Sequence, residues 1–91
     1  MRTWNDFKNE AKNVSEFSKE DIEEMEQLAI IISAIIDKRN ELGISQRELA
    51  DLCGLPHSSV ARIESCAVKP KVETLIKIMK PLGLKLMAVS I

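Results

Sequence analysis

The sequence predicts a small all-α domain, and three observations lead to that prediction. Ser18 with Asp21 and Ser45 with Glu48 each have the three-residue spacing of a capping box, which marks the start of a helix. Apolar side chains then recur at three- and four-residue intervals, the period of an amphipathic helix. Gly43, Gly54 and Gly83 stand where three of the patterns stop, and 91 residues suffice for one domain with a single core.

The first long apolar pattern predicts a helix from about Lys19 to Leu42, closed by Gly43. Isoleucines at 30–32 and 35–36 cover nearly every direction around its axis, and a helix that is apolar all round is buried all round. The sequence leaves two possibilities for what covers the rest of this helix. Either residues 1–17, which carry a short amphipathic helical pattern of their own, fold back over this helix, or the helix forms a dimer or partner interface.

Two short helices and a tight turn come next. The Ser45 box starts a helix that runs to about Leu52, and Gly54 can take the positive φ that a turn requires. Pro56 suits the first turn of the following helix, which runs to about Ser65. Ala50 is small enough for the close approach of the two axes. The apolar side chains expected between the helices are Leu49, Cys53, Leu55, Val60 and Ile63.

This spacing, in the stretch "SQRELA…G…SSVARIE", resembles the helix-turn-helix of the XRE family, the lambda-repressor and Cro type. The resemblance covers roughly Ile31 to Gly83. It implies a five-helix DNA-binding fold in which the helix from Pro56 to Ser65 enters the major groove. A helix hairpin that serves structure alone, without DNA binding, is the alternative.

The resemblance also assigns roles to individual residues. Base reading falls to His57, Ser58 and Arg62, of which Arg62 suits the O6 and N7 atoms of guanine. His57 has two other readings, a phosphate contact or an exposed residue without a role. Arg39 and Glu64 correspond to the family's structural ion pair. The phosphate contacts fall to Gln46, Ser59, Lys69 and Lys71.

One departure from the family lies after the second short helix. The family often has Asn-Gly there, whereas this chain has Ser65 and Cys66. If the turn needs a positive φ at Cys66, that residue is strained, because a side chain disfavours the left-handed region. The departure bears on the loop geometry and on the Lys69 contact more than on the fold.

The last third of the chain predicts a helix and then a strand. A helical pattern from Val72 to Leu82 is closed by Pro81 and Gly83. The tail then alternates apolar and other residues, which is typical of a strand. We expect its partner to be the same strand of a second subunit, which makes a homodimer. The residues assigned to that dimer contact are Leu84, Leu86 and Val89. The predicted division is thus an N-terminal helical extension (1–17), a helix-turn-helix domain (18–83) and a dimerisation strand (84–91).

The net charge of −1 hides an asymmetry. Residues 1–26 carry four basic and eight acidic side chains, whereas residues 27–91 carry nine basic and six acidic ones. A polyanion would be attracted to the second part and repelled by the first. The overall charge therefore does not exclude DNA binding, and the acidic part suits a basic protein partner.

The acidic extension, the very apolar first helix and the "LGLKL" tail together resemble the HigA-type antitoxins. That resemblance implies a dimer that binds the operator of its own operon and neutralises a HigB toxin, a ribosome-dependent mRNA endonuclease of RelE-like fold. Trp4 and Phe7 either anchor the toxin or cover the isoleucines of the chain's own helix. The residues assigned to the toxin contact are Trp4, Phe7, Phe17, Glu20 and Glu24. A stand-alone phage-like or housekeeping repressor of the XRE family, without a toxin, is the alternative.

Other classes of function find little support. A single histidine, three glycines and no recognisable carboxylate pair argue against an enzyme, and no cofactor is expected. Cys53 and Cys66 lack metal-binding spacing and are expected to be structural thiols. An aromatic content of 3% argues against a single-strand binder. The apolar run from Leu28 to Ile36 is too short for a bilayer and the N-terminus is polar, so a cytoplasmic protein without a membrane contact is expected.

Overall fold

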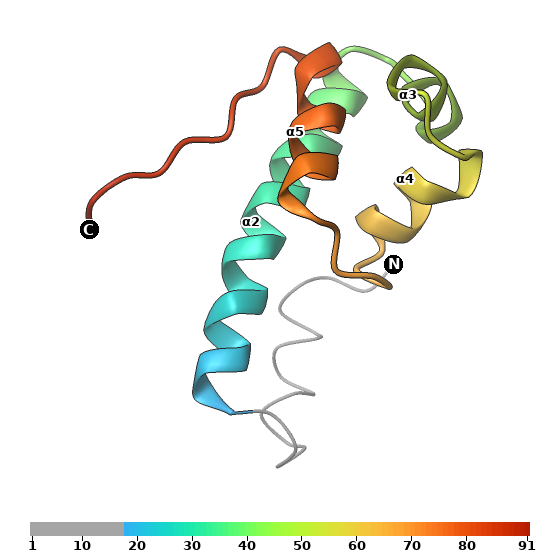
Figure 1. Ribbon diagram of the computed structural model, residues 1–91. Coiled ribbons are helices and arrows are strands. Elements are labelled where there is room, and N and C mark those ends of the chain that lie inside the picture. Colours follow the sequence, from blue (N-terminus) through green and yellow to red (C-terminus); the bar gives the residue numbers. More distant parts are fainter. Residues whose placement is uncertain (1–17) are drawn as a thin grey trace. The chain divides into compact units, whose positions relative to one another are not determined.

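The computed structural model describes residues 18–91, and this part of the chain is all-helical, as predicted. In chain order it contains α2 (Lys19–Glu41), α3 (Gln46–Cys53), α4 (His57–Glu64), α5 (Val72–Met79) and the 3-10 turn η1 (Lys80–Leu82) (Figure 1). The described residues thus hold four α-helices rather than the five predicted. Trp4, Phe7 and Phe17, and the short N-terminal helix predicted around the first two, lie outside the described residues. The chain divides into two compact units, Met1–Ile31 and Ile32–Ile91.

Helix α2 begins at the first predicted capping box. The backbone N–H of Asp21 donates to Ser18 Oγ (3.1 Å), and the backbone N–H of Ser18 donates to the Asp21 carboxylate (3.4 Å). Within the isoleucine stretch, Ile32 and Ile35 are buried, whereas 71% of Ile30 is exposed. Burial therefore follows one side of the helix in the single chain, and Ile30 presents an apolar side chain to solvent. No helix within residues 18–91 has the length and apolar content that a membrane crossing requires.

The second unit has an aliphatic core to which every helix in it contributes. Helix α3 lies at the centre, in contact with α4, α5 and η1. The Cys53 thiol donates to the backbone carbonyl of Lys77 (3.5 Å), and burial raises the pKa of this thiol, an effect that the nearby Lys77 charge opposes. The buried side chains of this unit are Ile32, Ile35, Leu49, Ala50, Cys53, Val60, Ile63, Leu75, Ile78, Met79 and Leu82.

The chain after α5 departs from the prediction. Helix α5 passes into η1, which contains Pro81 and ends at Gly83 with a φ of 73°. Residues 84–91 form neither a helix nor a strand, and Figure 1 shows this segment, in red, as an extended trace that leaves η1. The predicted strand is therefore wrong for the single chain. A strand is defined by hydrogen bonds to a second strand, and residues 18–91 contain no segment that supplies them.

Candidate nucleic-acid interface

The turn between α3 and α4 has the geometry that the sequence predicts. Gly54 follows α3 in the left-handed conformation with a φ of 67°, where a side chain would be strained. The backbone N–H of Leu55 donates to the carbonyl of Ala50 (2.9 Å), which closes the end of α3. Ala50 is fully buried where the two helices meet, and Val60 and Ile63 of α4 are buried beside it in the core. These contacts fix α4 at a defined angle to α3.

A capping box fixes the start of α3. The backbone N–H of Glu48 donates to Ser45 Oγ (3.0 Å), and the backbone N–H of Ser45 donates to the Glu48 carboxylate (3.3 Å). Both side chains are thus committed to the end of the helix, which confirms the structural role predicted for them. A cap of this kind stabilises a helix by about 1 kcal/mol.

Glu64, at the end of α4, joins this helix to the end of α2 and the start of α3. Its carboxylate accepts hydrogen bonds from Arg39 Nε (2.7 Å) and Arg39 Nη2 (2.9 Å), so the predicted ion pair is confirmed and is bidentate. Arg39 Nη1 also donates to the backbone carbonyl of Ile44 (2.8 Å). Only 13% of the Arg39 side chain and 6% of the Glu64 side chain are exposed. Removal of one partner would leave a buried charge unpaired, at a cost of about 3–5 kcal/mol.

Gln46 belongs to the same cluster, which the sequence does not reveal. Its Nε2 donates to Glu64 Oε1 (3.0 Å), so the side chain predicted to contact phosphate is held against α4. The amide keeps a second N–H and its oxygen for other contacts. Because Gln46 opens α3, the Arg39–Glu64–Gln46 cluster ties together the end of α2 and both helices of the motif.

The three residues predicted to read bases lie on the exposed side of α4. His57, Ser58 and Arg62 are exposed, whereas Val60 and Ile63 of the same helix are buried. Ser58 and Arg62 are four residues apart and therefore share one face of the helix. The helix thus separates an apolar face, which packs on α3, from a polar face that is open to solvent.

The residues predicted to contact phosphate do not form one cluster of side chains. Ser59 is half-buried near the start of α4, whereas Lys69 and Lys71 are exposed in the loop between α4 and α5. Arg47, which the sequence analysis did not single out, is exposed in the first turn of α3. Its position next to Gln46 was the signal that could have identified it.

The loop after α4 begins with the strained residue that the sequence predicts. Cys66 has a φ of 61°, a value that a non-glycine residue rarely adopts. Its backbone N–H donates to the carbonyl of Ile63 (3.1 Å), and the N–H of Ala67 donates to that of Arg62 (3.0 Å). These two bonds form a Schellman motif, in which the left-handed position is usually glycine. The end of α4 therefore has Schellman geometry with Cys66 in the position that glycine suits best.

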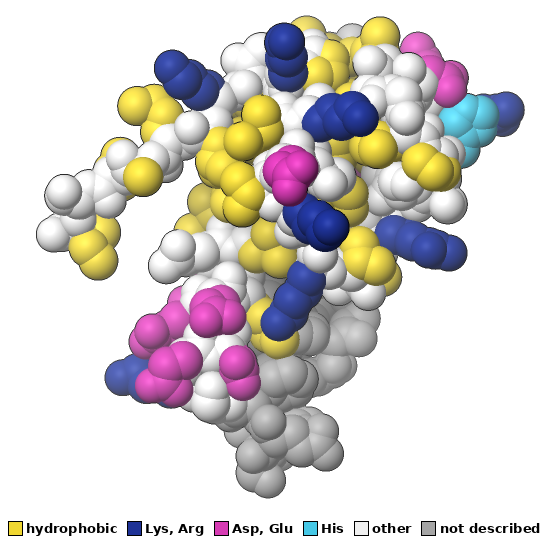
Figure 2. Space-filling model, in the orientation of Figure 1, with side chains coloured by type: hydrophobic (Ala, Val, Ile, Leu, Met, Phe, Trp, Pro, Cys, Tyr) yellow, Lys and Arg dark blue, Asp and Glu magenta, His cyan; other side chains and the backbone are white. Residues whose placement is uncertain are grey.

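A contact that the sequence did not reveal links the two helices across the turn. His57 Nε2 lies 2.6 Å from Asp51 Oδ1, and both side chains are exposed (48% and 63%). Figure 2 shows the histidine, in cyan, at the surface.

Cys53 is buried and Cys66 is exposed, and both are free thiols. Among residues 18–91, no three His, Cys, Asp or Glu side chains are placed to hold a metal ion.

Comparison with known proteins agrees with this geometry. The sequence pattern of the helix-turn-helix family matches residues 35–88. The chain is 38% identical, over 80 residues, to an uncharacterized HTH-type transcriptional regulator of Haemophilus influenzae, a match that covers 88% of this chain and 76% of that protein. It is 46% identical, over 48 residues, to the HTH-type transcriptional regulator PuuR of Escherichia coli, which covers 53% of this chain and 26% of PuuR.

A solved structure extends the likeness to the whole chain. The structure is described as a toxin-antitoxin module from Streptococcus pneumoniae, and it matches with a TM-score of 0.67 and 34% sequence identity. The match covers 100% of this chain and 96% of the other. The family match, the relatives and the geometry of α3 and α4 agree with the XRE-type motif of the sequence. The chain therefore belongs to the helix-turn-helix family.

Proposed function

We propose that this chain is a transcriptional regulator that binds double-stranded operator DNA through α4 and also neutralises a toxin. The observation that carries the DNA-binding part is the exposed polar face of α4. Ser58 and Arg62 share this face, and His57 stands at the leading end of the helix. Short polar side chains and an arginine are the groups that reach base edges in the major groove.

The second support is the rigidity of that face. The half-buried Arg39–Glu64–Gln46 cluster holds the far end of α4, and the Gly54 turn fixes its near end. Base reading requires side chains held in register with the groove, because phosphate contacts and base contacts form together. The exposed cations Arg47, Lys69 and Lys71, outside α4, are available for the phosphates.

Two observations support the toxin as a partner. The family pattern begins at residue 35, whereas the match to the toxin-antitoxin module spans the whole chain. The likeness therefore includes the acidic part that precedes the motif. Glu20 and Glu24 are exposed and four residues apart on α2, and Figure 2 shows acidic side chains gathered over the first half of this helix. An acidic helix face suits a basic protein such as an RNA-cutting enzyme.

The kind of toxin proposed is a HigB-type mRNA endonuclease of RelE-like fold, in keeping with the HigA-like features of the sequence. No enzymatic activity and no cofactor are proposed for the chain itself. A stand-alone repressor of the same family is the second candidate. It has the same α4 surface, and the two proposals differ only in whether a toxin binds.

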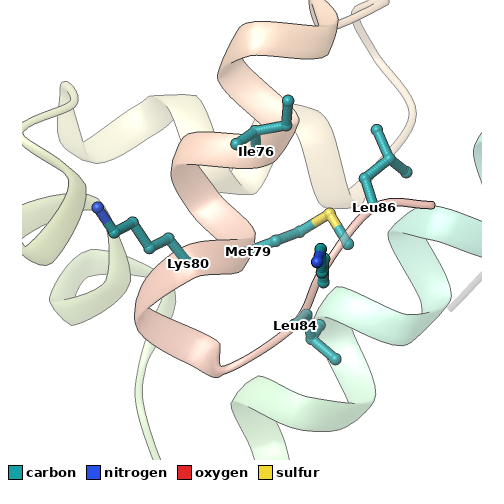
Figure 3. A pocket seen from close by; sticks show the side chains of 6 residues that line it. Ile76, Met79, Lys80, Leu84 and Leu86 are labelled. Atoms are coloured by element: carbon teal, nitrogen blue, oxygen red, sulfur yellow. The ribbon is translucent and has the colours of Figure 1, made fainter.

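We also propose that the regulator is a homodimer that uses its C-terminal segment. An open pocket of about 430 Å³ lies between α5, η1 and the segment that follows them (Figure 3). Four apolar side chains and two lysines line it, namely Ile76, Met79, Lys80, Leu84, Lys85 and Leu86. In Figure 3, Met79 extends from α5 toward the chain that carries Leu84 and Leu86. Beyond them, Met87 and Val89 are 70% and 77% exposed. Apolar side chains along an unpaired extended segment favour a second copy as the partner.

The test of the toxin partnership is co-expression of the full chain with the product of the adjacent reading frame. We expect the two proteins to co-purify and the chain to restore growth. Glu20→Gln combined with Glu24→Gln should weaken the complex by about tenfold at low salt, because the acidic face steers a basic partner. Glu73→Gln, which removes an exposed acid of α5, is the control and should leave the complex unchanged.

Deletion of residues 1–17 provides a second comparison. Neutralisation of the toxin should fall more than operator binding, because the proposed aromatic anchors Trp4, Phe7 and Phe17 are removed while the helix-turn-helix remains. An equal loss of both activities would favour a segment that only covers the chain's own helix. Absence of any complex with the neighbouring protein would favour the stand-alone repressor.

A further inference from the structure

The contact between Asp51 and His57 connects a residue with a predicted role in DNA binding to one without any predicted role. His57 is the first residue of α4 and is predicted to read bases, whereas Asp51 lies in the last turn of α3 and has no predicted role. Their side chains meet across the turn, with 2.6 Å between Nε2 and Oδ1. Exposed ion pairs contribute little to stability. Stability alone therefore gives little reason for the pair.

The chemistry of the pair fixes which edge of the imidazole is available. An ionised carboxylate only accepts hydrogen bonds, so Nε2 must carry the proton that it donates to Asp51. This holds for the neutral and for the protonated ring. Within residues 18–91, the structure gives the His57 ring no other hydrogen bond. The ring can therefore meet DNA only through Nδ1 and its carbon edge.

The bond to Asp51 also bears on the two contacts open to His57. In the neutral ring, Nδ1 carries no proton and can only accept a hydrogen bond, which a phosphate oxygen cannot donate. The amino groups of adenine and cytosine in the major groove can donate one. In this form of the ring, the pair favours a base contact over a phosphate contact by His57.

We propose that Asp51 is a specificity-determining residue of the DNA interface, which acts by holding the His57 ring so that Nδ1 faces one base pair. This inference rests on the proposed binding of operator DNA through α4. Asp51 is a positioning residue in this account, because it acts through His57. Its removal frees the ring to rotate and to present either nitrogen, so the preference at that one base pair is lost.

The experiment measures base preference at every operator position by selection from a randomised duplex library. It uses the full chain as wild type and as Asp51→Ala, Asp51→Asn, His57→Ala and the double variant Asp51→Ala with His57→Ala. Asparagine keeps the acceptor oxygen without the charge and therefore separates hydrogen bonding from electrostatics. Glu73→Ala removes an exposed acid elsewhere and is the matched control for net charge.

We expect Asp51→Ala to reduce the preference at a single base pair by about 5-fold, the effect of one hydrogen bond. Asp51→Asn should retain most of that preference, and the double variant should match His57→Ala. Glu73→Ala should change no preference, and each variant should keep the melting temperature of the wild type to within a few degrees.

Two results would overturn the inference. In the first, Asp51→Ala leaves every base preference intact while wild type still selects a defined operator. In the second, Asp51→Ala and Asp51→Asn raise the affinity for all sequences equally, which is the behaviour of a charge without a positioning role. A wild type that binds no duplex at any salt concentration would instead overturn the proposed DNA binding itself, and this inference with it.

Discussion

At the scale of single residues, the Glu64 carboxylate shows what the sequence reveals and what it hides. Its pairing with Arg39 is predicted from the resemblance to a known motif, and the structure confirms it at 2.7 Å. Gln46 is the third member of this cluster, because its side-chain amide donates to Glu64. The motif assigns that amide to a phosphate contact instead. An ion pair between helices can be predicted from the matching positions in a known family. A hydrogen bond shared by a third side chain depends on rotamers that a sequence does not specify.

Cys66 provides the first prediction at this scale. It holds a φ of 61°, which costs a residue with a side chain about 1–2 kcal/mol. Cys66→Gly should therefore raise the free energy of unfolding by about 1 kcal/mol, as measured by urea denaturation. Glycine fits because the Schellman bonds of Cys66 and Ala67 involve the backbone alone.

Cys66→Ala is the matched control, because it removes the same thiol but keeps a Cβ in the left-handed conformation. The free energy of unfolding of this variant should stay close to that of wild type. Equal stabilisation by glycine and alanine would show that the thiol, rather than the backbone strain, was responsible.

At the scale of elements, the helices follow local signals and the tail does not. Helices α2 and α3 begin at the two capping boxes, and left-handed glycines follow α3 and η1, so the sequence predicts their bounds to within a few residues. A helix forms most of its backbone hydrogen bonds within itself, and nearby residues cap the groups left over at its ends. Its bounds can therefore be predicted from its own stretch of sequence. A strand needs a partner, and the alternation of residues 84–91 cannot show whether a single chain supplies one.

The tail provides the prediction at this scale. Val89→Asp should weaken self-association of the full chain by about tenfold or more, because it places a charge in the proposed apolar contact. The dissociation constant is measured by sedimentation equilibrium. Since 77% of Val89 is exposed in the single chain, the substitution should not disturb folding.

Val89→Leu keeps an apolar side chain at the same position without a charge, and it is the control. It should leave self-association near the wild-type value. The same dissociation constant for the two variants would contradict the proposed contact through alternating apolar residues.

At the scale of the whole molecule, charge is divided unevenly along the chain. The acidic excess lies in residues 1–26, before the motif, and the basic excess lies in the remainder. This division was visible in the sequence and explains how a chain of net charge −1 can present a surface for DNA. The Asp51–His57 pair was not visible, because it joins residues on two helices whose relative angle only the fold determines.

The exposed face of α4 could be predicted from the sequence because the motif specifies how α4 packs. The motif fixes which α4 positions pack on α3, and His57, Ser58 and Arg62 lie on the other side of the helix, where they are exposed. The choice between a regulator with a toxin and one without could not be read from this surface, since both have the same α4. The toxin contact that we propose lies within residues 1–34, which precede the family match.

The most direct test of DNA binding through α4 is the affinity of the full chain for duplex DNA from upstream of its own gene and for a scrambled duplex, at several salt concentrations. Wild type should prefer the upstream duplex, and log K should fall by about 0.9 per contacted phosphate for each tenfold rise in salt. Arg62→Ala should lose about 1–3 kcal/mol of discrimination at one base pair, whereas Lys69→Ala should weaken binding to both duplexes equally. Equal affinity of wild type for the two duplexes, or unchanged selectivity in Arg62→Ala, would contradict recognition of DNA through α4.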